Sequence, residues 1–407
     1  MADNKTKKNS HYLSGKEIRE ITKQNRVITR ELEKKKHRKA DESEFVTKMK
    51  DDNNILEIED LHTYFYTDQG VVKAVNGVSF NVPKNSTVGI VGESGCGKSV
   101  TSMSIMQLVA GPQGQVVSGA MRFNSQDYKR DKNGEPISLK GENGEEHYET
   151  EEKVYDIAQM PINESYRIRG RQIAMIFQEP MTSLNPVFTI GNQLDEVTFI
   201  HVPGATKEMA KAKSMEMLDL VGIAAPERVY KAYPHELSGG MRQRVMIAMA
   251  LACNPRLIIA DEPTTALDVT IQAQILDLFR DLKTKINGSI LLITHDLGVV
   301  AEMADYVVVM YAGRVIEQGT VQEIFHNPMH PYTVGLQKSK PTMDSDSDTL
   351  FNIPGNVPNP INMPNHCYFK ERCSQCTKKC SGEYPKMIQV SPTHMVACHL
   401  YGEEDEK

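Results

Sequence analysis

The sequence lacks any run near the 18 or more uninterrupted apolar residues that a membrane-spanning helix requires. Its first residues also lack the apolar segment of a secretory signal. The formal net charge of −6 argues against a protein that binds nucleic acid over its whole surface. We therefore expect a chain that neither crosses a membrane nor is secreted. Its 407 residues suffice for one large domain with appendages, or for two or three smaller units.

Charge is distributed unevenly along the chain. Residues 1–52 hold 15 Lys and Arg against 10 Asp and Glu, with apolar residues at helical spacing on either side of Asn25. We expect a basic arm that is a solvated, partly disordered extension, with a short helix broken at Asn25. The alternative is an arm that lies on anionic lipid headgroups. A second polar stretch, residues 124–167, carries 11 acids and 6 bases and predicts an inserted surface loop with short ordered pieces at 137–139 and 154–157.

A glycine-rich segment predicts a phosphate-binding loop. Residues 92–99, Gly-Glu-Ser-Gly-Cys-Gly-Lys-Ser, fit the pattern G-x-x-x-x-G-K-[ST] and directly follow the apolar run 87–91. In a loop between a strand and a helix, glycines let backbone N–H groups approach phosphates, the lysine reaches the β and γ oxygens, and the serine holds Mg²⁺. The candidate nucleotide-binding residues here are Gly92, Ser94, Gly95, Cys96, Gly97, Lys98, Ser99 and Val100.

A carboxylate pair follows a second buried-strand pattern. The run 256–260 ends in Asp261 and Glu262. Downstream of a phosphate-binding loop, such a pair indicates that Asp261 completes the Mg²⁺ shell and that Glu262 orients or deprotonates the attacking water.

Four smaller features suit the same site. Gln178 follows an apolar run and is placed to sense the γ-phosphate, Mg²⁺ or the lytic water, and His295 ends another strand near the γ-phosphate. Asp268 follows the acid pair closely enough to reach across a subunit boundary, and Phe65 is a candidate to stack on adenine. Each also has a structural interpretation as a capped strand end, a core aromatic or a solvated polar residue.

The segment 237–244, Leu-Ser-Gly-Gly-Met-Arg-Gln-Arg, lies between the loop and the acid pair and indicates an ABC-type ATPase. Its helical surroundings, residues 191–252, place Ser238, Gly239 and Gly240 at a helix N-terminus that can face phosphate. Alternation over 55–82 around Asp68-Gln69-Gly70 predicts two antiparallel strands. Buried-strand runs separated by helical stretches predict an α/β core, the runs being 87–91, 173–177, 257–261, 289–294 and 306–311.

The chain resembles the ATP-binding subunits of oligopeptide and dipeptide ABC importers, specifically the D-type subunit of a D/F pair. The resemblance covers about residues 54–400 and rests on the segments 233–250, with Met241 where the F-type subunit usually has Gln, 178–186 and His330-Pro331-Tyr332-Thr333, and on the late cysteines. It implies an ABC-type nucleotide-binding domain with a RecA-like core, an antiparallel β subdomain and a helical signature subdomain.

The resemblance also implies partners and a mechanism. Two such domains pack head to tail, so that Ser238, Gly239 and Gly240 would close on ATP held by a partner. Closure would drive two polytopic permease subunits at the cytoplasmic face of the membrane, with contact through the Gln178 loop and residues 182–186. An F-type ATPase subunit and an extracytoplasmic peptide-binding protein complete the expected assembly.

Five of the seven cysteines crowd the C-terminal part of the chain, at positions 367, 373, 376, 380 and 398. A dense cluster in an intracellular chain indicates metal more often than disulfides. By resemblance, Cys367, Cys373, Cys380 and Cys398 would hold a [4Fe–4S] cluster, with Cys376 outside the set. Zinc and reduced structural thiols remain alternatives. Because the cysteines are far from the ATP motifs in sequence, we expect the ATP chemistry to be independent of them.

These inferences divide the chain into an arm at 1–52, an ABC ATPase domain at 53–320 with its insertion and a helical subdomain at about 186–252, and a small cysteine-rich extension at 321–407. Oligopeptides are the predicted cargo, with dipeptides, nickel or another small solute as alternatives. A soluble ABC ATPase that acts on ribosomes or DNA is the competing class, although the chain contains neither a long heptad coiled coil nor a second cassette.

Overall fold

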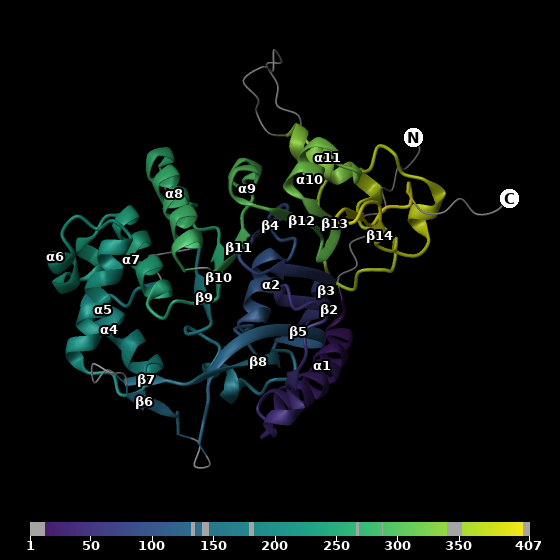
Figure 1. The fold of residues 1–407 in the computed structure, drawn as a ribbon. Helices are drawn as coiled ribbons and strands as arrows, with labels where there is room; N and C mark the ends of the chain where they lie inside the picture. The colour runs from purple at the N-terminus through teal and green to yellow at the C-terminus, as the bar shows by residue number, and fades with distance from the viewer. Residues whose placement is uncertain are drawn as a thin grey trace, which may run out of the picture.

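A computed structural model describes residues 13–131, 135–140, 146–178, 183–265, 268–286, 288–339 and 352–401. In Figure 1 a central sheet stands between a group of helices on one side and the C-terminal segment on the other, and a second sheet lies below it. Within these ranges no helix is both long and apolar enough to cross a bilayer.

The central sheet has a parallel middle. Its strand order is β14-β15-β13-β12-β4-β11-β10-β9, and the neighbours from β12 to β9 run parallel. The five predicted buried strands are confirmed to within one residue. The bounds are β4 Thr87–Val91, β9 Ile173–Ile176, β10 Leu257–Asp261, β11 Ser289–Ile293, β12 Tyr306–Tyr311, β13 Arg314–Thr320, β14 Ile388–Gln389 and β15 Met395–Val396.

The second sheet is antiparallel and has the order β1-β8-β5-β2-β3. The predicted pair around Asp68-Gln69-Gly70 is confirmed as β2 and β3. A separate two-stranded ribbon joins β6 to β7. The bounds are β1 Val46–Thr47, β2 Asn54–Thr67, β3 Gly70–Pro83, β5 Gly114–Tyr128, β6 Ser138–Lys140, β7 Glu146–Tyr148 and β8 Thr150–Asp156.

Helices cover the central sheet and form the predicted helical group at its β9 edge (Figure 1). One apolar core joins the two sheets through α2, and a second joins the helical group to β9, β10 and β11. The helices are α1 Gly15–Lys36, α2 Lys98–Ile105, α4 Ile190–His201, α5 Lys207–Leu220, α6 Pro226–Lys231, α7 Gly239–Leu251, α8 Val269–Ile286, α9 Leu297–Met303, α10 Val321–His326 and α11 Pro331–Lys338. Short 3-10 turns are η1 Glu42–Glu44, η2 Ile162–Arg167, η3 Pro234–Glu236, η4 Lys370–Arg372 and η5 Lys378–Ser381.

The N-terminal arm differs from the expected partly disordered extension. From residue 13 onward it is described, and α1 runs unbroken through Asn25 after a capping box formed by Ser14 and Glu17. Asn25 is buried, and its amide donates to the backbone oxygen of Thr67 over 2.7 Å. The predicted break is therefore wrong, because a residue that is a poor helix former gains a tertiary hydrogen bond here. Residues 1–12 of the arm lie outside the described ranges.

The stretch 124–167 also differs from the predicted surface loop. Residues 122–128 of β5 pair with residues 150–156 of β8, so much of the stretch belongs to the second sheet. The predicted ordered pieces correspond to β6 and to the end of β8. Strand β8 has few buried residues, and Tyr155 is its fully buried side chain. The sequence predicted a loop here because a strand with one polar face lacks the continuous apolar run of a buried strand.

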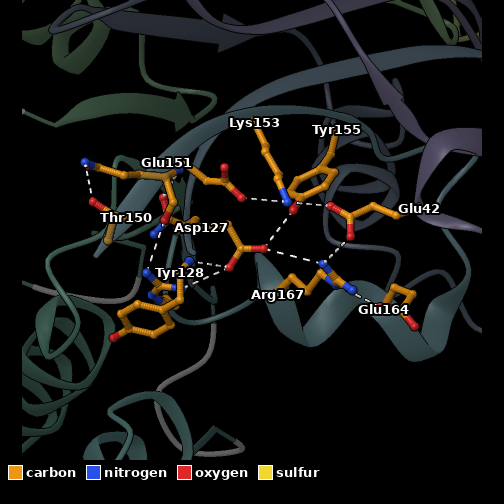
Figure 2. Close-up of polar contacts among 12 residues, drawn as sticks. Glu42, Asp127, Tyr128, Thr150, Glu151, Lys153, Tyr155, Glu164 and Arg167 are labelled. Atoms are coloured by element: carbon orange, nitrogen blue, oxygen red, sulfur yellow. Dashed lines mark hydrogen bonds and ion pairs between the residues drawn. The ribbon is translucent and has the colours of Figure 1, made fainter. Parts of the chain in front are cut away.

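A buried carboxylate ties the arm, the second sheet and η2 together (Figure 2). Asp127, on β5, accepts hydrogen bonds from the hydroxyl of Tyr155 at 2.7 Å and from Arg171 at 3.3 Å, and its carboxylate lies 3.6 Å from Arg167. Glu42 of the arm pairs with the same Arg167 at 3.2 Å. The arm is thus held to the second sheet by this network.

The C-terminal segment extends the central sheet. Strand β15 pairs with β13, and β14 pairs with β15. A third apolar core joins β4, β12 and α11 to the segment 353–369. The segment 353–369 and the strands β14 and β15 therefore join the same sheet that carries the phosphate-binding loop.

Candidate functional site

The phosphate-binding loop connects β4 to α2, as predicted. The ammonium group of Lys98 donates to the backbone oxygens of Gly92 at 2.8 Å and of Glu93 at 3.2 Å. Lys98 is buried, so its positively charged ammonium group is enclosed by the backbone of the loop. This is where the phosphates of a nucleotide would be received.

Two glycines shape this loop. Gly97 has a φ of 102°, and a Cβ atom there would lie 2.3 Å from the backbone oxygen of Ala74. Gly95 has a φ of 78° and open space beside it. Any larger residue at Gly97 would push the loop away from β3, whereas Gly95 is required for its backbone conformation alone. Cys96, between them, is buried, and burial raises the pKa of its thiol.

Ser99 and Asp261 meet at the carboxyl end of the parallel strands. The hydroxyl of Ser99, at the start of α2, donates to the carboxylate of Asp261, at the end of β10, over 3.0 Å. Burial raises the pKa of Asp261. A divalent cation would stabilise the charged form of this carboxylate, and Mg²⁺ is bound by one or two protein oxygens together with phosphates and water. The two side chains therefore fit the predicted Mg²⁺ site.

Glu262 is the centre of a polar cluster. One carboxylate oxygen accepts from the amide of Gln178 at 2.9 Å and from the hydroxyl of Thr265 at 2.9 Å. The other lies 3.3 Å from Nδ1 of His295. Glu262 itself has a φ of 46°, a strained conformation for a non-glycine residue that is often found at functional sites.

The loop and this cluster face a common hollow of about 190 Å³. Its lining thus joins predicted residues from three separate segments of the sequence. The lining residues are Ala74, Ser94, Gly95, Gly97, Lys98, Ser99, Val100, Gln178 and Glu262. Ala74 was not predicted from the sequence, because it is an ordinary apolar residue on a strand.

Other predicted residues lie away from this hollow. Ser238 caps α7 by accepting from the N–H of Met241, and both Ser238 and Gly239 are exposed. Asp268 is exposed and caps α8 by accepting from the N–H of Ile271 at 3.0 Å.

The start of α7 also lies against α8. A Cβ atom on Gly240 would lie 3.1 Å from the side chain of Ile271, and this glycine is not among the residues that line the hollow. Phe65 lies on β2 opposite Val72 and Gly114 and is likewise not among them. The roles predicted for these residues in a partner's site and in adenine stacking stay predictions. Of the segment 182–186, Thr182 lies outside the described residues.

The late cysteines gather in the C-terminal segment. Cys380 and Cys398 are buried, Cys367 and Cys373 are half-buried, and Cys376 is exposed. Burial, reinforced by the nearby thiols of Cys380, Cys398 and Cys373, raises the pKa of Cys367 to about 11. Within the described ranges, no three His, Cys, Asp or Glu side chains are placed to share one metal ion.

One contact with the phosphate-binding loop was not predicted. Arg372, which immediately precedes Cys373, donates to both carboxylate oxygens of Glu93, at 2.6 and 2.9 Å. Tyr332 accepts from the N–H of Glu93 at 2.8 Å. The C-terminal segment is therefore distant from the ATP motifs in sequence but not in space, and the expectation that the ATP chemistry is independent of the cysteines rested on the sequence distance alone. A signal was present, since Tyr332 belongs to one of the distinctive sequence segments, but no sequence pattern links it to the loop.

Comparison with known proteins gives matches over most of the chain. Residues 75–265 match the ABC transporter family, and residues 316–380 match the C-terminal region of oligopeptide/dipeptide transporters. The chain is 47% identical to the oligopeptide transport ATP-binding protein AppD of Bacillus subtilis over 86% of this chain and 98% of that protein. It is 49% identical to OppD of the same organism, over 85% and 88% of the two chains, and 45% identical to its dipeptide transport ATP-binding protein DppD, over 86% and 96%.

Solved structures support the fold. The ATP-binding cassette MJ0796, in a dimeric post-hydrolysis state bound to ADP and Pi, aligns with a TM-score of 0.52 and 24% identity, over 65% of this chain and 98% of that one. The part of the chain that contains the phosphate-binding loop, the acid pair and the helical group therefore has the fold of an ATP-binding cassette.

Proposed function

Because this chain belongs to the family of oligopeptide and dipeptide transport ATP-binding proteins, we propose that it is the ATP-hydrolysing subunit that drives an oligopeptide importer. The observation that carries the proposal is the arrangement around Glu262. The carboxylate lies at the hollow lined by Lys98 and Ser99. Thr265 contacts it from the same loop, and Gln178 and His295 contact it from two other segments.

Each of these residues has a role in binding or hydrolysis. Lys98 and the backbone N–H groups of residues 94–99 bind the phosphates, and Ser99 and Asp261 hold Mg²⁺. Mg²⁺, when bound, neutralises charge that develops on the phosphates. Glu262 orients or deprotonates the attacking water, because its carboxylate is held at the edge of the hollow by Gln178 and Thr265. Gln178 and His295 are placed to respond to the γ-phosphate.

We further propose that the site is completed by a second ATPase subunit. Ser238 and Gly239 are exposed and away from the chain's own phosphate-binding loop, so they are available to a partner's nucleotide. The D-type feature at Met241 favours an F-type subunit as that partner. Asp268 would lie at the same boundary, and Phe65 would stack on adenine. ATP can shift such a pair between open and closed states only through its unequal affinity for them.

The transport assembly follows from the family. The proposed partners are two polytopic permease subunits, contacted through the Gln178 loop, and an extracytoplasmic binding protein that selects the peptide. The chain would act at the cytoplasmic face of the membrane. Dipeptides are the alternative cargo, since relatives named for both are similarly close to this chain.

We also propose that the late cysteines hold a [4Fe–4S] cluster. Burial, reinforced by neighbouring thiols of the same set, raises the pKa values of Cys367, Cys373 and Cys398. A cubane takes one thiolate at each of four irons, so its ligands need not converge on one ion. These residues fit such a group, which would cross-link the C-terminal segment. Zinc bound by the same thiols is the alternative.

Expression with the permease subunits and the F-type subunit tests the proposed function. The chain should sediment with membranes, co-purify with its polytopic partners and hydrolyse ATP faster when the loaded binding protein is present. A stable, ATP-dependent homodimer that supports full transport would contradict the heterodimer. Salt-sensitive association with ribosomes, without membrane partners, would instead support the competing soluble class of ABC ATPases.

A further inference from the structure

The phosphate-binding loop contains an acid, Glu93, directly after its first glycine. A carboxylate at the edge of a site for a triphosphate disfavours ligand binding unless its charge is neutralised. In this chain the neutralising group comes from 279 residues later in the sequence. Arg372 makes a bidentate pair with Glu93, at 2.6 and 2.9 Å, which is the geometry of a strong charge-assisted contact.

Arg372 is fixed by the C-terminal segment. Its side chain is only 4% exposed. The Nε group donates to the backbone oxygen of Pro354 at 3.0 Å, and the two terminal nitrogens also reach the hydroxyl of Tyr311 at 3.3 Å and the backbone oxygen of Ile353 at 3.4 Å. The guanidinium group therefore has little freedom to follow Glu93 if the loop moves, and it holds the loop in one position.

A second contact fixes the backbone of the same residue. The hydroxyl of Tyr332, at the start of α11, accepts from the N–H of Glu93 at 2.8 Å. Tyr332 is fully buried, and its ring packs on Tyr311 and Phe369 with centroid separations of 4.7 and 5.5 Å. Side chain and backbone of Glu93 are thus both held by residues from the C-terminal part of the chain.

These contacts act on the nucleotide-binding lysine. The ammonium group of Lys98 donates to the backbone oxygen of Glu93 at 3.2 Å, and the N–H of Cys96 reaches the same oxygen at 3.3 Å. A rotation of the Glu93 peptide would therefore move an acceptor that positions Lys98 and would change the curve of the loop.

We propose that Arg372 and Tyr332 are positioning residues for ATP: they neutralise and orient Glu93, and through it the C-terminal segment sets the affinity of the phosphate-binding loop for MgATP. This inference rests on the proposed ATPase function. It assigns a role to the segment His330-Pro331-Tyr332-Thr333, which the hydrolytic mechanism does not use.

The test measures MgATP affinity of the full chain with a fluorescent ATP analogue, and KM and kcat in the assembled transporter. Arg372→Met should raise the Kd and KM by about tenfold, because the carboxylate of Glu93, in the loop that receives the phosphates, is left without its partner. The kcat at saturating ATP should change little, since Glu262 and Gln178 are untouched. The double variant Arg372→Met with Glu93→Gln should regain a Kd within about threefold of the unmodified protein, because the repelling charge is removed.

Two controls separate this effect from general damage. Glu371→Gln alters the neighbouring residue, whose side chain is 83% exposed, and should leave the Kd unchanged. Tyr332→Phe keeps the buried ring and removes only the acceptor for the N–H of Glu93, so it should raise the Kd severalfold. If Arg372→Met does not fold, Arg372→Lys, with and without Glu93→Gln, provides the same comparison with an expected change of about threefold.

An unchanged Kd in a folded Arg372 variant would overturn the inference, and so would a double variant as weak as the single one, because the effect would then not pass through Glu93. Lys98→Ala is the reference. If Lys98→Ala abolishes binding while the Arg372 variants bind normally, only the positioning role fails. If Lys98→Ala binds MgATP normally, the proposed ATPase site itself is wrong.

Discussion

The amide of Gln178 donates to the carboxylate of Glu262 over 2.9 Å, which joins the segment that follows strand β9 to the residue directly after strand β10. Gln178 comes from the loop proposed to contact the permease, and Glu262 is the proposed catalytic base. A movement of that loop would therefore change the position of the carboxylate that is proposed to orient or deprotonate the attacking water. This hydrogen bond would therefore link the proposed permease contact to the proposed catalytic base.

Replacing Glu262 by Gln should abolish turnover and leave MgATP binding largely intact. The amide cannot accept the proton of the water, and loss of a catalytic acid or base commonly lowers the rate by about 10² to 10⁴. Phosphate release at saturating ATP and nucleotide affinity are the two measurements. Lys98→Ala is the comparison, since it should weaken binding itself. Near-normal hydrolysis by the Glu262 variant, free of contaminating ATPases, would reject this assignment.

The cysteine proposal predicts a brown protein after anaerobic purification, with about four irons per chain. Serine at Cys367, Cys373, Cys380 or Cys398 should remove the colour and the iron. Cys376→Ser is the matched control, because this thiol is exposed and lies outside the predicted set. Stoichiometric zinc without iron would contradict the cluster. Loss of colour in the control would show that the four ligands were chosen wrongly.

Cys373→Ser should also weaken MgATP binding, by severalfold. Cys373 directly follows Arg372 in the chain. Loss of the cluster bond at Cys373 should therefore shift the backbone of Arg372 and move its guanidinium group relative to Glu93. Titration of the full-length variant with a fluorescent nucleotide measures the change, and Cys376→Ser again serves as the control. Equal affinities for the two variants would show that the ATP site does not respond to the cysteine segment.

Asp127→Asn should lower the free energy of unfolding by about 3 kcal/mol, because it leaves two largely buried guanidinium groups, Arg167 and Arg171, without their shared anion. Urea unfolding followed by circular dichroism measures this, since the chain has no tryptophan for fluorescence. Glu149→Gln removes a surface ion pair with Lys129 and should leave the free energy of unfolding nearly unchanged. Similar losses for both variants would argue against the buried network.

The C-terminal part of the chain should lose stability as the pH falls below about 6.5. Burial lowers the pKa of His330 to about 3, against 6.5 for the free side chain, so between these values the unfolded chain takes up a proton that the folded one does not. The loss from this group is about 1.5 kcal/mol between about pH 6.5 and about pH 5.

The control for His330 is His330→Asn, which keeps an acceptor for the N–H of Tyr332 but does not titrate. Its unfolding free energy should depend less steeply on pH over the same interval. If the unfolding free energies of the unmodified protein and of the His330→Asn variant depended on pH in the same way, His330 would be already protonated in the folded chain, or not buried.

The sequence by itself determined the elements whose signal is local. The strands before Lys98 and Glu262 and the helix after Ser238 were predicted within a residue or so, because a buried strand, a glycine-rich turn and a helix cap each depend on neighbouring residues. The Ser99–Asp261 contact was predictable for a related reason. The carboxyl ends of all parallel strands lie at one edge of a sheet, so the residues after β4 and at the end of β10 face the same edge, although β11 lies between the two strands.

Only the tertiary structure decided which distant segments share an environment. Asn25 was read as a helix break because its amide disfavours helix, yet the oxygen of Thr67 offers it a partner. Strand β8 was read as a loop because its burial depends on pairing with β5. The contact of Arg372 with Glu93 spans 279 residues and depends on how the C-terminal segment packs against the central sheet. Charge and spacing along a chain carry no information on such pairings, because packing rather than sequence separation sets the distance between the side chains.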